Sequence, residues 1–444
     1  MNASAQGEPP PTPHNNPPRI AVDDLRVGHY VHLDLGWMDH PFARSSFKIT
    51  SQRQIETIRS LGLTEVRYAP ERSDPVVTAP ADHPQAAADA AGAPATEASV
   101  APAPSAASDT HRQSVLAAQR QALQQCERRC AESSRAVKAV LDQFETAPEQ
   151  AGQACARLIQ GMVTQIPSQE DAVLRLLAEG HGDRATLHAM NVTVLSLLLG
   201  RAMGMAAEEL EALGVAAVLH DVGKVELPDR VRFRDDSFTS AHFKLYQEHV
   251  MHSVAWGRRM GLSTAALLAI AQHHEAADGS GFPKGLHEAQ LSPAARILAL
   301  INRYDGLCNP PNPLKALTPH EALSLIFATM KPRFEQQTLN AFIRMMGVYP
   351  PGSVVQLTDE RYALVISVNS SRPLKPRGMV YDTTVACEDA LLLDLQQHED
   401  LGIQRSLRIE QLPRAALTYL SPRQRICYYF ERAAQATEVS ETMA

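Results

Sequence analysis

The stretch His220-Asp221-Val222-Gly223-Lys224 is the point around which the rest of the sequence can be organised. It follows the apolar run Leu213–Leu219, whose composition predicts a buried helix. A carboxylate at the end of such a helix needs a cation, a hydrogen-bond network or a metal ion, because an unpaired buried charge is costly. Histidine and aspartate are both metal ligands, so the adjacent pair indicates a metal site if other segments supply further ligands.

Further candidate ligands occur on other predicted helices. His188 and His249 each fall on the inward face of a helix, the pair His273-His274 ends a third helix, and Asn302 lies on a fourth. One inward histidine is usual in a core. Five imidazoles with a carboxylate share a simpler explanation, which is a metal cluster. Mixed nitrogen and oxygen ligands fit two first-row ions, and such pairs suit phosphodiester hydrolysis.

Lys224 lies one helical turn beyond His220. It is placed to meet a phosphate as a point charge, or else it is a solvated lysine at a helix end.

Composition narrows the class of protein. The chain has 444 residues and a net charge of −7, which predicts two or three domains and disfavours nucleic-acid binding. Its 6 cysteines are scattered, as in reduced cytosolic proteins. The longest apolar run, Val192–Leu199, is too short to span a membrane, and the N-terminus lacks the apolar core of a signal peptide. We expect a cytoplasmic protein.

The order of patterns predicts the domains. Residues 1–18 are a disordered tail, residues 19–72 a small α/β domain, and residues 73–110 an Ala/Pro-rich linker. Within the small domain, residues 37–42 form either a contact loop or part of its core. Residues 149–347 are a helical domain, residues 348–432 a β-rich element to which we assign no chemistry, and residues 433–444 a tail.

A linker helix over residues 111–148 joins these parts. Leu116, Leu123, Cys130, Val137 and Phe144 repeat every seven residues, which is half of a coiled-coil seam. The helix therefore either forms a homodimer through residues 111–144 or packs on the next domain.

The motifs together resemble the HD-GYP family. They are His188, His220-Asp221-Val-Gly-Lys224, His249 and the long stretch His273-His274-Glu275-Ala-Ala-Asp278-Gly-Ser-Gly281-Phe282-Pro283-Lys-Gly285-Leu286. The resemblance covers about residues 149–347, and residues 19–72 resemble the small domain that often precedes this family. It implies a mainly α fold with an HD-type helical bundle, between a small α/β N-terminal domain and a short β-rich C-terminal element. It also implies a phosphodiesterase that hydrolyses the bacterial second messenger cyclic di-GMP to pGpG, GMP or both at two Fe or Mn ions.

The resemblance assigns roles by position. The implied metal ligands are His188, His220, Asp221, His249, His273, His274 and Asn302, with Asp221 and Lys224 as catalytic residues. The implied substrate-binding residues are Lys224, Gly281, Phe282, Pro283 and Asp305. The glycine-rich loop, with Asp278, Gly279, Gly281, Phe282 and Pro283, is the implied contact for a diguanylate cyclase domain.

This chain departs from the family pattern at several positions. Phe282 replaces a tyrosine, and Asn302 replaces the last metal-binding aspartate, with Asp305 as a possible substitute. Pro311 replaces an arginine that contacts substrate phosphate, a loss that Arg303 or Arg296 could cover. The glutamate that adds a third metal in some members would fall near Arg184, so we expect two ions.

Two functions from different classes follow. The first is catalysis, which the ligand set favours. The second is a catalytically weak or inactive HD-GYP module that binds cyclic di-GMP or a protein partner, which Asn302 and Pro311 favour. Hydrolysis of another nucleotide is disfavoured by the complete glycine-rich loop.

Overall fold

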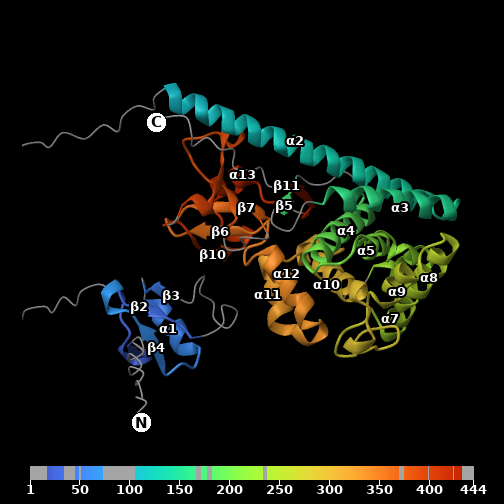
Figure 1. The fold of residues 1–444 in the computed structure, drawn as a ribbon, viewed down its shortest axis with the longest axis horizontal. Coiled ribbons are helices and arrows are strands. Elements are labelled where there is room, and N and C mark those ends of the chain that lie inside the picture. The colour runs from blue at the N-terminus through green and yellow to red at the C-terminus, as the bar shows by residue number, and fades with distance from the viewer. Residues whose placement is uncertain are drawn as a thin grey trace, which may run out of the picture. The chain divides into compact units, whose positions relative to one another are not determined.

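The computed structural model describes residues 18–34, 46–49, 52–73, 106–166, 172–177, 183–233, 238–369, 375–398, 400–423 and 425–432. They belong to two compact units, residues 1–101 and residues 102–444, each of which has its own sheet (Figure 1).

The N-terminal unit is a four-stranded antiparallel sheet with one helix. The strands lie in the order β1 (Arg19–Ala21), β4 (Glu65–Tyr68), β2 (Tyr30–His32), β3 (Ser46–Lys48), and the helix is α1 (Gln52–Ser60). Gly28 has a φ of 97° in the turn before β2, a conformation that glycine adopts at little cost. Val31, Ile55, Ile58 and Val66 are buried between sheet and helix. The predicted small α/β fold is confirmed, whereas the contact loop expected at residues 37–42 lies outside the described residues.

The C-terminal unit is mainly helical. Its helices are α2 (Ala106–Gln143), α3 (Pro148–Gln165), α4 (Arg184–Ala202), α5 (Ala207–Leu219), α6 (Asp229–Arg232), α7 (Ser240–Gln247), α8 (His249–Arg259), α9 (Thr264–Gln272), α10 (Pro293–Cys308), α11 (Pro319–Thr329), α12 (Gln336–Met346) and α13 (Arg414–Leu420). Capping residues set several starts: Asp183, Ser263 and Ser292 each accept a hydrogen bond from a backbone N–H of the first turn of α4, α9 and α10.

Two central helices explain the apolar runs of the sequence. Val192, Leu195 and Leu199 of α4 are fully buried, and Leu213–Leu219 of α5 is buried throughout. Helices that are apolar on all sides belong in the middle of a fold. His220 and Asp221 therefore emerge directly from the core.

The long helix α2 packs against the rest of its own unit. Cys130, Val137 and Phe144 of the predicted seam are buried, and α2 lies against α3, α4 and the C-terminal strand (Figure 1). Near its other end, Arg120 forms an ion pair with Asp389 at 3.0 Å. The C-terminal half of the predicted seam therefore packs on the same chain, which is the second of the two alternatives for this helix.

The second sheet joins the helical and β-rich regions. Its main path is β10 (Ile403–Leu407), β6 (Val354–Leu357), β7 (Tyr362–Asn369), β5 (Ala172–Leu176), β11 (Tyr428–Arg432), and β8 (Arg377–Val380) pairs with β7 and with β9 (Leu392–Asp394). The predicted β-rich element over residues 348–432 supplies β6 to β11, whereas β5 lies inside the stretch predicted to be helical. Because β5 precedes the helical bundle and pairs with both β7 and β11, the C-terminal strands are built onto that bundle.

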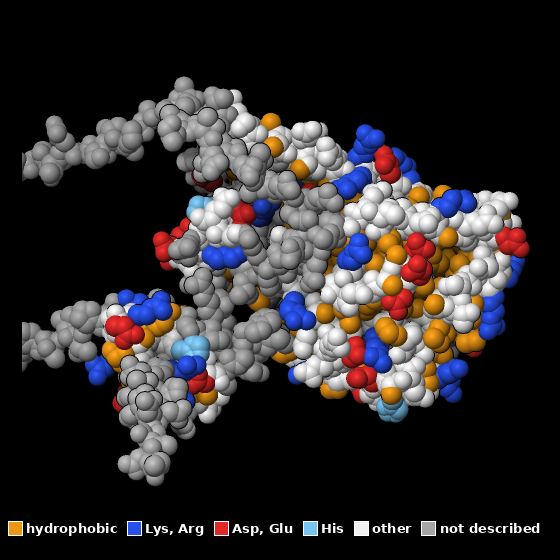
Figure 2. All heavy atoms as spheres, in the orientation of Figure 1, with side chains coloured by type: hydrophobic (Ala, Val, Ile, Leu, Met, Phe, Trp, Pro, Cys, Tyr) orange, Lys and Arg blue, Asp and Glu red, His pale blue; other side chains and the backbone are white. Residues whose placement is uncertain are grey.

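The surface charges are mixed, and the described helices do not have the character of membrane spans. On the face in Figure 2, Lys, Arg, Asp and Glu side chains of the described residues are interspersed over the helical region. Among the helices of the described residues, none combines the length and apolar character needed to cross a membrane.

Candidate metal centre

Three helices of the bundle end in the same way. His220 follows α5, His273 follows α9, and His249 comes two residues after α7. Their Nδ1 atoms lie against the carbonyl oxygens of the residues three positions earlier, Ala217 at 2.8 Å, Ile270 at 2.6 Å and Tyr246. Carbonyls in a last helical turn lack an intrahelical donor, so an Nδ1–H at this position satisfies them.

These hydrogen bonds set the tautomer of each ring. A carbonyl oxygen only accepts, so Nδ1 of His220, His249 and His273 carries the proton. The lone pair is then on Nε2, which is the form that binds a metal. The predicted helix that contains His249 is two helices, α7 and α8, which meet at Glu248, where the Tyr246 carbonyl is engaged by the His249 ring.

His188 is oriented by a carboxylate instead. Its Nδ1 lies 2.6 Å from Asp305 Oδ2, and the other oxygen of Asp305 accepts hydrogen bonds from the amides of Asn191 and Asn309, both at 2.8 Å. Asp305 is 1% exposed. Both oxygens of this buried carboxylate are engaged, and Asp305 is not part of the cleft lining. The structure therefore does not agree with the expectation that Asp305 binds substrate or replaces a metal ligand. Its position suits it to hold the ring of His188.

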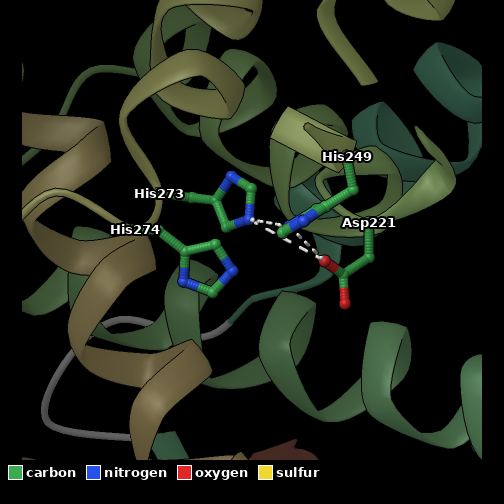
Figure 3. Close-up of side chains that lie close together, drawn as sticks. All are labelled: Asp221, His249, His273 and His274. Atoms are coloured by element: carbon green, nitrogen blue, oxygen red, sulfur yellow. Dashed lines mark hydrogen bonds and ion pairs between the residues drawn. The ribbon is translucent and has the colours of Figure 1, made fainter. Parts of the chain in front are cut away.

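Asp221 lies between two groups of imidazoles. Its Oδ2 is 3.7 Å from His188 Nε2 and 3.5 Å from His220 Nε2. Its Oδ1 is 3.5 Å from His249 Nε2 and 3.8 Å from His273 Nε2 (Figure 3). The ligand atoms form two sets that share Asp221: one with His188 and His220, the other with His249, His273 and His274.

Two polar atoms in this cluster have no protein partner. Within the described residues, Asp221 Oδ1 and His274 Nε2 are buried without a hydrogen bond. A buried polar atom is normally satisfied, and the exceptions need an explanation. Metal coordination supplies one, because the unsatisfied atoms are a carboxylate oxygen and an imidazole nitrogen that face the other ligands. The residues present therefore fit the divalent ions that the family resemblance implies.

The protonation states of the imidazoles and of Asp221 also favour metal binding. Burial lowers the pKa of His220 to about 4 and those of His249 and His273 to about 3, so these rings are neutral at pH 7. Burial acts to raise the pKa of Asp221, but the Lys224 ammonium together with the neighbouring imidazoles outweighs it and holds that pKa well below its usual range. Metal ligands must be in these deprotonated states.

Lys224 is tied to the cluster. Its Nζ forms an ion pair with Asp221 Oδ2 and lies 5.4 Å from the centre of the Tyr246 ring. Burial acts to lower the pKa of Lys224, but the Asp221 carboxylate outweighs it and raises that pKa, so the ammonium keeps its proton. Gly223 explains why the motif contains a glycine: a Cβ there would lie 2.3 Å from the His249 carbonyl oxygen and from the Ser253 nitrogen.

The glycine-rich loop closes one side of the cluster. Phe282 stacks on His274 with the ring centres 4.5 Å apart, and its peptide bond to Pro283 is cis. Glu275 holds the loop, because its carboxylate accepts hydrogen bonds from the backbone nitrogens of Lys284 at 2.7 Å and Leu286 at 2.9 Å. This role of Glu275 was not predicted, although the residue directly follows His274 in the motif.

Gly281 lies inside this loop. A Cβ there would lie 2.3 Å from Ala276 N, so the backbone could not pack as it does with a larger residue. Asp278 and Pro283 are exposed on the outer edge, with Gly279 beside them at a φ of 78°.

The cluster opens into a cleft of about 900 Å³. Its lining includes Lys224, Phe282, Asn302, Arg303, Pro311 and Lys315. Asn302 thus faces the cleft beside the metal ligands. Arg303 also lines it, whereas Arg296 does not: its guanidinium forms an ion pair with Glu335 and donates to the Glu288 carbonyl at 2.9 Å. The expectation that Arg296 covers for Pro311 is therefore wrong.

Two family models match successive parts of the chain, and the first extends beyond the N-terminal unit into α3. A family model described as a domain of unknown function, DUF3391, matches residues 18–155, and one described as an HD domain matches residues 172–337. A cyclic di-GMP phosphodiesterase of Pseudomonas aeruginosa is 29% identical over 379 residues, which cover 82% of this chain and 84% of that protein.

Two further relatives match a shorter part of the chain. A cyclic di-GMP phosphodiesterase response regulator of Xanthomonas campestris is 29% identical over 150 residues, 33% of this chain and 39% of that protein. A 3'3'-cGAMP-specific phosphodiesterase of Vibrio cholerae is 31% identical over 122 residues, 27% of this chain and 23% of that protein. The chain therefore contains an HD domain with a DUF3391 domain ahead of it, and its cluster of candidate ligands agrees with the resemblance to the HD-GYP family.

Proposed function

We propose that the chain is a metal-dependent phosphodiesterase that hydrolyses cyclic di-GMP to pGpG, GMP or both. The observation that carries this proposal is the position of Asp221, whose two oxygens face two separate sets of imidazole nitrogens. A shared carboxylate of this kind suits a pair of divalent ions. The relatives named as cyclic di-GMP phosphodiesterases support the substrate.

The donor set favours Fe or Mn. His188, His220 and Asp221 would hold one ion, and Asp221, His249, His273 and His274 the other. Neutral imidazoles with a carboxylate suit first-row ions. When bound, such ions supply Lewis acidity and an activated water.

The chain's own residues bind and orient the substrate. Lys224 keeps its positive charge next to Asp221, where it can stabilise negative charge on a phosphate. Phe282 and Tyr246 lie over His249 and His274 and keep water from that side of the cluster. The cleft of about 900 Å³ is large enough for a dinucleotide.

A binding role without turnover is the second candidate. Two positions favour it: Asn302 brings no charge to the ligand set, and Pro311 lines the cleft where an arginine was expected. A neutral amide oxygen binds a divalent ion more weakly than a carboxylate does.

Partner binding through the glycine-rich loop stays a prediction. Asp278 and Pro283 on its outer edge are exposed and available to a cyclase domain. Gly281 and Phe282 are partly buried, so they support the loop from inside.

The test combines metal content and turnover in one anaerobically purified sample supplied with Mn or Fe. About two ions per chain, with pGpG or GMP produced from cyclic di-GMP, is the expected result. Asp221→Asn should lose both, whereas Asp229→Asn is a matched control because that side chain is 92% exposed. Metal with binding but no turnover would support the second candidate, and preference for 3'3'-cGAMP would overturn the proposed substrate.

A further inference from the structure

Two arginines from distant parts of the chain line the same cleft as the candidate metal ligands. Arg184 is the first residue of α4, and Arg425 comes shortly before β11. Both belong to the lining of the cleft that contains His188 and Asp221. Arg425 lies outside the part of the chain that the HD domain model matches.

One face of α4 carries Arg184 and also holds the backbone next to Arg425 near the candidate metal centre. Arg184, His188 and Asn191 follow one another at i, i+4 and i+7, so they share that face. Asn191 donates a hydrogen bond to the Ile426 carbonyl at 2.7 Å and accepts one from the Tyr428 nitrogen at 3.0 Å. The backbone next to Arg425 is therefore fixed along the helix face that carries Arg184 and His188.

A second asparagine fixes the same backbone. Asn309 accepts a hydrogen bond from the Ile426 nitrogen at 2.9 Å and donates one to the Ile426 carbonyl at 3.0 Å. Asn191 and Asn309 also hold Asp305, the carboxylate that orients His188. The C-terminal segment and the ligand His188 thus share one hydrogen-bond network, which makes the position of Arg425 part of the site.

The charges of the two arginines are not neutralised. Within the described part of the chain, neither guanidinium forms an ion pair or hydrogen bond with another residue, and Arg184 lies 4.5 Å above the ring of Phe233. Both line the same cleft, where burial and the like charge of Arg425 lower the pKa of Arg184. The carboxylates of Asp305 and Asp221 act against this lowering of the pKa. Two like charges that line one cleft without a direct ion pair favour an anionic ligand.

We infer that Arg184 and Arg425 bind the phosphodiester of the cyclic dinucleotide that is not being cleaved. The inference rests on the proposed function. With one phosphodiester at the candidate metal ligands beside Lys224, the other must lie elsewhere in the same cleft and needs its own positive partner. Guanidinium groups match phosphate oxygens in pairs, and this pair replaces the arginine that is absent at Pro311.

The test measures cyclic di-GMP binding by calorimetry with the full-length, metal-depleted protein, so that the result does not depend on turnover. Arg184→Ala and Arg425→Ala should each weaken binding about tenfold, which is the size expected for one charge-assisted contact. Arg414→Ala is the matched control, because Arg414 is an exposed arginine of α13 outside the cleft lining. Thermal unfolding of each variant shows whether it has folded, and Arg184→Lys, which keeps the charge, should recover part of the affinity.

Salt separates phosphate from base recognition. The loss in Arg425→Ala should shrink at 1 M NaCl, where charges at an exposed site are screened over about 3 Å. A loss that salt does not change would indicate a contact with guanine and overturn the phosphate assignment. Unchanged affinity in both variants would overturn this inference while leaving the proposed function standing. If the wild-type protein neither binds nor hydrolyses a cyclic dinucleotide, the proposed function fails, and this inference fails with it.

Discussion

At the scale of single residues, the candidate site depends on which nitrogen of each histidine carries a proton. Three of the five candidate rings are oriented by backbone carbonyls, whereas His188 is oriented by a side chain, Asp305. Changing Asp305 therefore changes the tautomer of one ligand without removing it.

Asp305→Asn should weaken metal binding by roughly 10-fold to 100-fold, the usual effect of changing a residue behind a metal ligand. In the wild-type protein the NH₂ groups of Asn191 and Asn309 donate to Asp305 Oδ1. If the amide oxygen of the variant faces His188, its own NH₂ group meets these two donors. If it turns round, its NH₂ group faces His188 Nδ1 and forces the proton onto Nε2. Titration against a competing chelator measures the change, with Asp229→Asn as control, and an affinity equal to wild type would contradict this account.

Asn302→Asp should raise metal occupancy. The residue faces the cleft beside the ligands, and a carboxylate there adds one negative charge next to the cations. Metal content after dialysis, measured with turnover on the same sample, tests this expectation. If neither quantity changes, Asn302 does not contribute to metal binding.

The sequence predicted which candidate ligands lie together, but not which residues orient them. His188, His220, Asp221, His249, His273 and His274 could be named because helical periodicity and the motifs pointed them inward, and the structure brings them together. The role of Asp305 could not be predicted from the sequence. Its carboxylate faces His188 and not the cleft because it accepts hydrogen bonds from Asn309 and from Asn191, which lies on a different helix.

At the scale of elements, the loop after α9 depends on one buried carboxylate. Glu275 is 3% exposed, and its two oxygens accept from two backbone nitrogens of the loop. This arrangement keeps Phe282 against His274.

Glu275→Ala should lower the free energy of unfolding by about 2–3 kcal/mol, because it leaves two backbone N–H groups without their acceptor. Chemical denaturation measures this change, and Glu288→Ala, which changes an exposed glutamate further along the same loop, is the control. Equal losses in the two variants would show that the Glu275 carboxylate does not hold the loop.

Strand β5 shows why part of the fold could not be predicted. It is only five residues long, Ala172–Leu176, and a short apolar run does not distinguish a strand from a helix. Its partners β7 and β11 come from the far end of the chain. Without knowledge of that pairing, the C-terminal region was expected to carry no chemistry. It nevertheless brings Arg425 to the cleft, beside Ile426, whose carbonyl accepts a hydrogen bond from Asn191.

At the scale of the whole molecule, burying neutral histidines makes stability depend on pH. In the unfolded chain these rings bind protons near pH 6.5, whereas in the fold His220, His249 and His273 do so only near pH 3 to 4. Between these values the unfolded state binds more protons, so stability rises with pH and is lost as pH falls.

The metal-depleted protein should therefore lose stability between pH 6 and pH 5, by about 1.4 kcal/mol per pH unit for each such histidine. Denaturation at several pH values gives the slope. His249→Gln should reduce that slope by about one proton, while His287→Gln, a change at an exposed position, should leave it unchanged. A slope that is the same in all three proteins would contradict the assignment of buried neutral rings.

The pairing of β5 with β11 also has a consequence for the timing of synthesis. Arg175 and Glu431, which form an ion pair at 2.8 Å across these strands, are 256 positions apart. A ribosome that adds 5–20 residues per second needs about 13–50 s to cover that interval. During this time α4 and its histidine exist without the strand that completes their surroundings. The nascent chain therefore lacks the completed surroundings of His188 until β11 has emerged, which delays the formation of the site by that interval.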